Sequence, residues 1–332
     1  MYPLVSVVVP VFNREGLIVR TLDSLWSQSY PNLEIIVVDN NSTDQSQEIV
    51  KNYMQLHSND EVTRSSKLLY EEKQGASFAR QKGLENAHGE LVIFFDSDDT
   101  MQPCLIKKAV DTIESDADLD IVCWKCRLHL LDGKRRVPPV LIRSHLEGHL
   151  IHCLLRPQGF MVKTKLIKQI GGWNKPLKVW DDLELGFRLL SQNPKIGVID
   201  EILADVFSQR DSMTGEGFIS KKGEWEEALK EIRKENAKSL QSIKAKTEML
   251  LDYRIAILAA HYAKEGDKKA AKALFKSLTT VCNTAPAGGL YKILYRGCLK
   301  FCYHYTRFGF RGAWIIFCGV SRIFPQLSQR NY

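Results

Sequence analysis

The first hundred residues alternate between short apolar runs and longer amphipathic segments. Residues 4–12 (LVSVVVPVF) and 33–39 (LEIIVVD) are nearly continuous runs rich in β-branched side chains, a pattern typical of buried strands. Between these runs, apolar residues recur at helical spacing from Ile18 to Trp26. The pattern therefore predicts a strand, a helix and a second strand in this order.

The same alternation continues to residue 96. Ser42–Gln45 fits a capping box and predicts a helix that continues to about His57. Residues 67–72 predict a third strand, residues 75–87 a helix, and residues 91–96 (LVIFFD) a strand that ends in an acid. Strands and helices alternating at these lengths predict a mostly parallel sheet covered by helices on both faces.

Regularity weakens after residue 100. We expect a helix near 103–115, a strand near 119–130, and helices over 163–170 and 181–193, while residues 133–160 are irregular and basic. Within that stretch, His145, His149 and His152 recur at helical spacing, which favours an amphipathic helix over a zinc site.

The remainder of the chain is helical in pattern. Residues 224–283 predict helices, and Tyr253–Leu278 predict one helical hairpin. The expected architecture is an α/β domain over residues 1–222, followed by a helical C-terminal extension over residues 223–332 that is basic and aromatic.

Composition adds an expected location. Hydrophobic residues make up 44% of the 332 positions, enough for a packed core. The N-terminal sequence MYPLVSVVVPVFN lacks the features of a signal peptide, and no run of about 18 apolar residues occurs. We therefore expect a cytoplasmic protein whose eight cysteines are free thiols.

The net charge of +7 is concentrated at the C-terminal end. From Lys268 onward there are eleven Lys or Arg residues and no Asp or Glu, so the preceding chain is net negative. Aromatic residues alternate with these cations over residues 290–324. This segment predicts peripheral binding to anionic lipid at the inner face of the cell membrane. The alternative is that the aromatics pack as core, and no nucleic-acid-binding motif occurs.

Acidic residues follow the predicted strands. Asp39 ends the second strand, and Asp96-Ser97-Asp98 ends the fourth. Because ligands of open parallel sheets bind beyond the carboxyl ends of the strands, these acids are candidates for one site. A D-x-D turn can share one Mg²⁺ or Mn²⁺, although it can also be a solvated helix cap. No P-loop or G-x-G-x-x-G motif competes with this interpretation.

Residues 4–100 resemble the nucleotide-binding half of family 2 glycosyltransferases, which have a GT-A fold. The resemblance rests on VSVVVPVFNRE, on LEIIVVDNNSTD and on GASFARQKGLENAHGELVIFFDSDD. Phe12 stands where Tyr is common in the family, and Gln81 where Asn is usual. The resemblance implies a nucleotide-binding half over residues 1–100 and an acceptor half over residues 101–222.

The resemblance also implies residue roles. Asp39 would accept a hydrogen bond from the base, Asp98 would be the principal metal ligand with Asp96 beside it, and Arg80 would lie near the base or the diphosphate. Arg210 belongs to a segment whose usual His is absent here. The implied nucleotide-sugar site consists of Pro10, Phe12, Glu15, Asp39, Arg80, Asp96, Ser97 and Arg210.

The acceptor side is predicted from residues 171–188 (GGWNKPLKVWDDLELGFR). Asp181 and Asp182 lie in the first turn of a helix, where the helix dipole favours an ionised carboxylate. Asp182 can therefore act as a base on an acceptor hydroxyl, or the pair can simply cap the helix. The resembling family carries Glu-Asp here, with the second acid as base. Asp181 and Trp180 are expected to contact the acceptor, although Trp180 can instead pack as core.

Together these features predict an inverting, non-processive, metal-dependent glycosyltransferase of the hexosyltransferase type. The expected donor is a UDP-sugar, and the expected acceptor is a saccharide, which can be lipid-linked, in surface polysaccharide biosynthesis. Two alternatives remain: a sugar-nucleotide nucleotidyltransferase, which normally has a Gly-rich N-terminal loop, and a non-catalytic scaffold that binds a partner complex.

Overall fold

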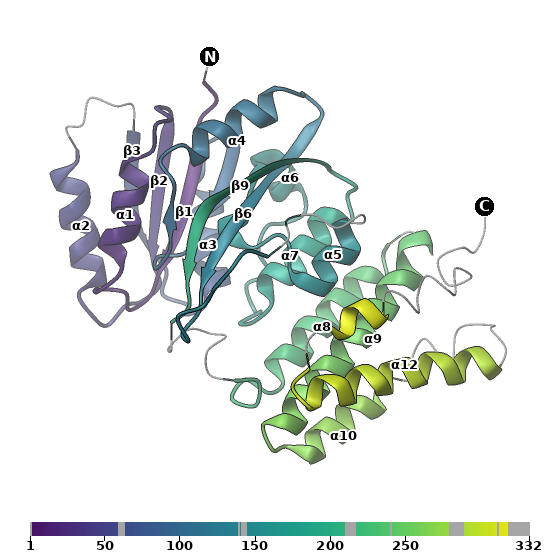
Figure 1. Ribbon diagram of the computed structural model, residues 1–332. Helices are drawn as coiled ribbons and strands as arrows, with labels where there is room; N and C mark the ends of the chain where they lie inside the picture. The colour runs from purple at the N-terminus through teal and green to yellow at the C-terminus, as the bar shows by residue number, and fades with distance from the viewer. Residues whose placement is uncertain are drawn as a thin grey trace. The chain divides into compact units, whose positions relative to one another are not determined.

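The computed structural model describes residues 2–58, 64–138, 140, 145–209, 217–239, 241–278, 289–310 and 312–317 (Figure 1). The chain forms two compact units. Unit 1 comprises residues 1–145 and 153–212, and unit 2 comprises residues 146–152 and 213–332. The division thus falls at residue 212, whereas the sequence analysis placed a domain boundary after residue 222.

Unit 1 contains the sheet and its covering helices. Its elements are β1 (Val5–Val11), α1 (Ile18–Trp26), β2 (Leu33–Asp39), α2 (Ser46–Leu56), β3 (Arg64–Tyr70), α3 (Ala76–Glu85), β4 (Leu91–Phe94), β5 (Thr100–Met101), α4 (Leu105–Glu114), β6 (Leu119–His129), β7 (Arg135–Arg136), the 3₁₀ helix η1 (Pro157–Gly159), β8 (Phe160–Lys163), α6 (Thr164–Gln169), α7 (Asp181–Leu190) and β9 (Lys195–Phe207).

The described strands pair in the order β3-β2-β1-β4-β8-β6-β9-β5, with β7 against β6. The first four of these neighbours are parallel, and Val7 of β1 lies opposite Ile35 of β2 and Ile93 of β4. The chain runs from β1 outward through β2 and β3, then returns to place β4 on the other side of β1. The mostly parallel sheet is confirmed, and its topological switch point lies between β1 and β4.

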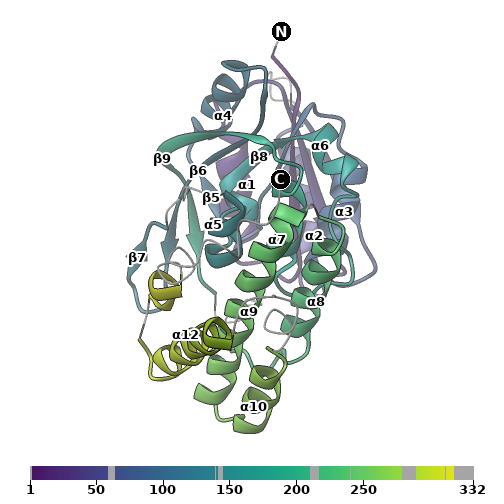
Figure 2. The same cartoon turned by 90° about the vertical axis from the view of Figure 1, so that its right-hand side faces the viewer.

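Both faces of the sheet are covered. Val5, Val7 and Val9 of β1 pack in one core with residues of α1, α2 and α4, while Val8 points to the opposite face, as strand alternation requires. There α3 approaches closely at Gly83, where an added Cβ would lie 2.2 Å from Val8 Cγ1. Figure 2 shows α4 and α3 on opposite sides of the sheet.

The second half of the sheet departs from the predicted pattern. β8 is antiparallel to both β4 and β6, and β9 is parallel to β6. No pattern in the sequence predicts either of these two strands. The spacing of His145, His149 and His152 predicts an amphipathic helix, and α5 (His145–His152) lies there; η1 falls in the part of residues 133–160 that was expected to be irregular. These strands were missed because mixed pairing leaves no simple alternation of strand and helix along the sequence.

The predicted capping box is wrong in detail. Helix α2 begins at Ser46, and no side chain caps it at Gln45. Asp44 Oδ1 accepts a hydrogen bond from the Ser46 amide, and Glu15 Oε2 accepts one from the Gln45 amide. Residues 42–45 therefore form a loop that is tied to the end of β1, because acids from both segments satisfy the free amides of the helix start.

Unit 2 is helical. It contains most of α5, together with α8 (Glu224–Asn236), α9 (Gln241–Lys264), α10 (Lys268–Lys276) and α12 (Gly289–Arg307). Helix α9 contacts α8, α10 and α12, so it forms the centre of the bundle. The predicted hairpin over Tyr253–Leu278 is present as the end of α9 followed by α10.

Candidate functional site

The predicted acids gather at the carboxyl edge of the parallel strands. β1 leads into Phe12 and Asn13, β2 ends at Asp39, and β4 leads into the turn at Asp96. β1 lies between β2 and β4, so the three strand ends are neighbours. The sheet topology thus brings together residues that are widely separated in sequence.

The turn after β1 is held by a network of side chains. Asn13 has a positive φ of 49°, and its Oδ1 accepts a hydrogen bond of 2.8 Å from the Thr43 amide. The Glu15 amide donates to Asp44 Oδ2. Pro10 is buried in β1, whereas Phe12 is 41% exposed at the edge. Phe12 and Glu15 therefore lie in the loop between β1 and α1, with Phe12 facing solvent, whereas Pro10 lies within the strand.

Asp39 is the most distinctive residue of the nucleotide side. Its side chain is 2% exposed. Oδ2 accepts a hydrogen bond of 3.2 Å from the Ser42 amide, but the buried Oδ1 has no hydrogen-bond partner within the described chain. A buried carboxylate oxygen without a partner is unfavourable. It is therefore well suited to accept an N–H group from a ligand.

The D-x-D turn is tied to three other segments. Asp96 accepts hydrogen bonds from Arg80 at 2.7 Å and from Gln158. The Gln158 amide nitrogen also lies 2.6 Å from Asp99 Oδ2. Asp98 Oδ2 lies 3.3 Å from the Nε of Arg14. Ser97, between the two D-x-D acids, is buried. The turn is thus a fixed, partly buried structure rather than a solvated acidic loop.

The carboxylates of this turn repel each other. Burial raises the pKa of Asp98, and Asp96 raises it further, against the opposing effect of Arg14. The pKa of Asp99 is raised well above its usual value by burial and by both neighbouring acids. Carboxylates whose pKa values are raised by burial and then by mutual repulsion are a favourable setting for a cation.

The donor set of the turn suits Mg²⁺ or Mn²⁺ only in part. Asp96 and Asp98 supply carboxylate oxygens, the ligands such cations prefer. Among the described residues, no group of three or more His, Cys, Asp or Glu side chains is arranged to hold a metal ion. The turn could therefore bind a cation as two protein ligands, with a diphosphate and water completing the coordination.

Arg80 links the two halves of unit 1. From α3, its guanidinium donates to Asp96 Oδ1 and to Asp181 Oδ2, both at 2.7 Å, and lies 4.7 Å from the ring centre of Trp173. Burial alone would lower the pKa of Arg80, but Asp96 and Asp181 raise it, so the guanidinium stays charged. Ser77, one turn earlier on α3, also donates to Asp181.

Asp182 lies at the start of α7, next to this network. Its Oδ2 is 3.1 Å from the thiol of Cys153, and its Oδ1 accepts a hydrogen bond from the Leu183 amide. Burial raises the pKa of Asp182, and Asp181 raises it further; Cys153, Arg80 and Arg156 act in the opposite direction. The helix dipole was expected to keep the acid ionised, but burial is the larger influence on its pKa.

Of the two remaining predicted site residues, the structure describes Trp180 but not Arg210. Trp180 precedes α7 with a left-handed backbone (φ 51°) and is partly buried. A positive φ is uncommon for a bulky residue and marks a locally constrained turn. Arg210 lies outside the described residues. The individual roles assigned to the site residues stay predictions.

Sequence reasoning missed three contacting residues of the site. Arg14 pairs with Asp98, Gln158 bridges Asp96 and Asp99, and Cys153 donates to Asp182. Arg14 directly follows the Phe12-Asn13 turn, so its position could have drawn attention. Gln158 and Cys153 come from the stretch that was expected to be irregular, and nothing in their sequence context pointed to the site.

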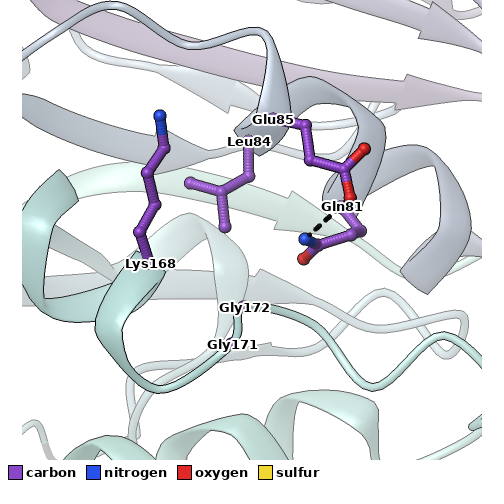
Figure 3. Close-up of a pocket in the computed structure, with 6 residues that line it drawn as sticks. All are labelled: Gln81, Leu84, Glu85, Lys168, Gly171 and Gly172. Atoms are coloured by element: carbon purple, nitrogen blue, oxygen red, sulfur yellow. Dashed lines mark hydrogen bonds between the residues drawn. The ribbon is translucent and has the colours of Figure 1, made fainter.

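A separate pocket of about 380 Å³ lies beside α3 (Figure 3). None of the candidate acids lines it. Its Gln81 donates to Glu85 within α3 and accepts a hydrogen bond of 2.7 Å from the Trp173 amide. These contacts hold α3 to the segment before α7, which gives the pocket a structural role. Its lining residues are Gln81, Leu84, Glu85, Lys168, Gly171 and Gly172.

Comparison with known proteins identifies relatives of this arrangement. A family model described as glycosyl transferase family 2 matches residues 6–173, about half of the chain. Similar curated proteins include the glycosyltransferase EpsH of Bacillus subtilis, 36% identical over 36% of this chain and 33% of EpsH. TuaG of the same species, whose name links it to teichuronic acid biosynthesis, is 38% identical over 33% of this chain and 41% of TuaG. The chain thus spans less than half the length of either relative.

Solved structures match over nearly the whole chain. Staphylococcus aureus TarS 1-349, in complex with UDP-GlcNAc, has a TM-score of 0.67 at 21% identity and covers 99% of this chain and 93% of that one. A mannosyltransferase of Pyrobaculum calidifontis, in complex with GDP-Man and Mn²⁺, has a TM-score of 0.55 at 17% identity and covers 98% of this chain and 88% of that one. At these identities the likeness establishes the fold alone, and the GT-A fold class expected from the sequence is confirmed.

Proposed function

This chain belongs to glycosyl transferase family 2, and from that membership we propose that it is an inverting glycosyltransferase with a UDP-sugar as donor and a saccharide hydroxyl as acceptor. The observation that carries the proposal is that Arg80 joins the D-x-D turn to the start of α7, where Asp182 lies. One guanidinium joins Asp96 of the nucleotide half to Asp181 of the acceptor half. A donor bound at the first half would therefore lie next to a base in the second.

The proposed nucleotide contact begins at Asp39. Its buried Oδ1 has no partner among the described residues and can accept an N–H from the edge of a base. Uracil offers one at N3, which is consistent with a UDP-sugar. The exposed ring of Phe12 lies at the neighbouring strand end and offers a face on which a base can stack.

The proposed diphosphate position is the D-x-D turn. Asp98 and Asp96 would hold Mg²⁺ or Mn²⁺. When bound, such a cation neutralises charge on the departing nucleoside diphosphate. The chain's own cations Arg14 and Arg80 lie against the same two acids. They hold the carboxylates in place and reduce their mutual repulsion.

The proposed base is Asp182. A raised pKa brings a carboxylate closer to neutral pH, where general bases are most effective. Asp182 takes the proton of the acceptor hydroxyl, the hydroxyl oxygen bonds to the anomeric carbon, and the bond from that carbon to the phosphate oxygen breaks. Attack from the side opposite the leaving group inverts the anomeric centre.

Acceptor binding is assigned to Trp180 and Asp181. Trp180 is only partly buried beside the base and can stack on a sugar ring. Asp181 Oδ2 is already engaged by Ser77 and Arg80, so its main effect would be to orient Arg80. The surface-polysaccharide role rests on relatives such as TuaG, whose name connects it with teichuronic acid. Transfer of one sugar per encounter at the inner face of the cell membrane completes the proposal.

Product analysis with defined substrates tests this function. The purified protein with Mn²⁺ should release UDP from a UDP-sugar, and the glycoside formed should carry the inverted anomeric configuration by NMR. Release of pyrophosphate from a nucleoside triphosphate and a sugar 1-phosphate would instead establish a nucleotidyltransferase. Turnover of GDP-sugars alone would show that the nucleobase of the donor is guanine and not uracil. Absence of turnover of any donor or triphosphate would favour a non-catalytic scaffold.

A further inference from the structure

Among the side chains of helix α12 that the structure describes, the buried ones lie on one face. Tyr295, Cys298, Leu299 and Cys302 are buried, and the helix packs against α9. The Tyr295 hydroxyl also contacts the Met249 carbonyl of α9 at 3.4 Å. This face fixes the helix to the bundle, so the opposite face has a defined orientation.

The opposite face is apolar and exposed. Ile293 is 68% exposed, Leu294 44% and Phe301 48%, and Phe308, just after the helix, is 71% exposed. Among the described residues, every exposed large hydrophobic side chain of unit 2 lies between positions 293 and 315. In unit 1 such residues are scattered over separate elements. A gathering of this kind on one helix marks an interaction surface.

Three cations border this apolar face. At about 100° per residue, Arg296, Lys300 and Arg307 fall within about 40° of one another around the helix, directly beside the sector of Ile293, Leu294 and Phe301. None of the three forms an ion pair with any described acid, and the chain carries no Asp or Glu after Asp267. Helix α12 therefore has an apolar band and a cationic band side by side along its length.

We propose that this α12 outer surface, formed by Ile293, Leu294, Arg296, Lys300, Phe301 and Arg307, binds the surface of a membrane that contains anionic lipid. The two bands match the layers of a lipid interface, with the apolar side chains at the acyl boundary and the cations at the phosphates. Because the cations run along the axis of α12 from Arg296 to Arg307, the helix lies in the plane of the membrane. Nucleic acid would use the cations but leave the exposed aliphatic side chains in water.

Vesicle co-sedimentation of the full chain tests this proposal. The protein should pellet with phosphatidylcholine vesicles that contain phosphatidylglycerol, less with phosphatidylcholine alone, and less as salt is added. Arg296→Gln with Lys300→Gln should weaken binding roughly thirtyfold, from about 1 kcal/mol per cation. Ile293→Ser with Phe301→Ser should weaken binding at every salt concentration.

Matched controls use exposed residues elsewhere. Lys268→Gln with Lys269→Gln removes the same charge from α10, and Leu56→Ser with Leu131→Ser removes exposed apolar side chains from unit 1. Both pairs should bind more tightly than the α12 variants. Unchanged thermal melting of each variant would show that the fold is retained.

Three results would overturn the proposal. The wild-type protein could remain in the supernatant at low salt, or the control pairs could lose as much binding as the α12 pairs. A dimer in solution that Ile293→Ser with Phe301→Ser abolishes, without vesicle binding, would assign the surface to a second copy of the chain. Sugar transfer in solution does not depend on this outcome, so the two proposals fail separately.

Discussion

Two arginines in this molecule each hold two carboxylates, one in unit 1 and one in unit 2. Arg80 lies 2.7 Å from both Asp96 and Asp181. Arg233 lies 2.9 Å from Glu248 and 3.1 Å from the fully buried Asp252. Taken alone, either cluster resembles a functional site, because both contain buried charged groups whose pKa values are shifted.

The two clusters differ in where their residues come from. Arg233 and its acids lie within the helices α8 and α9, and Tyr295 of α12 approaches Asp252 at 3.4 Å. In the Arg80 cluster, Asp96 follows a strand end and Asp181 begins a helix, although Arg80 itself lies within α3. Positions at the ends of elements can be reached by a ligand, whereas positions inside helix pairs mainly join those helices.

The clusters differ also in charge balance. In unit 2, one arginine faces two acids, of which one has a pKa raised to about 7 by burial. In unit 1, the acids around Arg14 and Arg80 outnumber these cations, and burial with mutual repulsion raises the pKa of Asp98 and Asp99. Both clusters therefore hold more acids than arginines, but the excess is larger in unit 1, and this larger excess is the better sign of a cation site.

The largest effect is expected for the base. Asp182→Asn keeps the shape of the side chain but cannot accept a proton, so transfer should fall by roughly 10²-fold or more while donor binding is retained. The matched change in unit 2, Asp252→Asn, should leave transfer intact. Steady-state kinetics and donor titration of both variants measure this. Wild-type transfer by Asp182→Asn would show that another residue is the base.

The next effect concerns the cation. Asp98→Ala removes the proposed principal ligand of the cation. Mutating a residue that only contacts a metal ligand already costs up to about 10²-fold in affinity, so Mn²⁺-dependent binding of UDP should weaken by at least that much. Calorimetry with and without Mn²⁺ measures the difference. Asp132→Ala, which removes an exposed carboxylate between β6 and β7, is the control. Equal UDP affinities for wild type and Asp98→Ala would remove the metal assignment.

The unit 2 cluster should affect stability instead of catalysis. Burial raises the pKa of Asp252 to about 7, and Glu248 contributes, while Arg233 and the Tyr295 hydroxyl oppose the rise. The folded protein therefore binds this proton more tightly than the unfolded chain. The stability it provides is present at acid pH and is lost as pH rises through about 7.

Asp252→Asn should remove that dependence. The melting temperature of the variant relative to wild type should increase from about pH 5 to about pH 8, with at most about 4 kcal/mol involved. Thermal melts of both proteins across this range provide the measurement. A difference in melting temperature that is constant with pH would show that Asp252 does not titrate in the folded state.

Sequence patterns predicted the strands and the acids at their ends, but they did not predict the contacts between distant segments. The strand at Leu33–Asp39 and the acids after β4 follow from local runs and from sheet topology. The approach of Arg80 to Asp181 spans 101 residues, and no local pattern encodes it. Cys153 reaches Asp182, and Gln158 reaches Asp96 and Asp99, across separations of 29 to 62 residues, and no local pattern encodes these contacts either.

The smallest effect is expected from removing the contact between Cys153 and Asp182, which the sequence did not predict. The Cys153 thiol donates to Asp182 Oδ2 at 3.1 Å and lowers the pKa of that carboxylate, as do Arg80 and Arg156, against burial and Asp181. Cys153→Ala should therefore raise the pKa of Asp182. The acidic limb of the pH profile of kcat would move to higher pH, with the rate on the alkaline plateau largely kept. Cys153→Ser retains a donor and should restore the wild-type limb.

This pair of variants separates positioning from packing. If Cys153 only fills space, Cys153→Ala would lower the rate equally at every pH, and Cys153→Ser would give no recovery of the limb. The left-handed backbone of Cys153 (φ 52°) is shared by all three proteins, so backbone strain stays constant across the comparison. A shift of the limb in Cys153→Ala that is absent in Cys153→Ser would therefore come from the hydrogen bond to Asp182. Substitutions in the Arg233 cluster should not move the acidic limb, because no residue of that cluster contacts the proposed base.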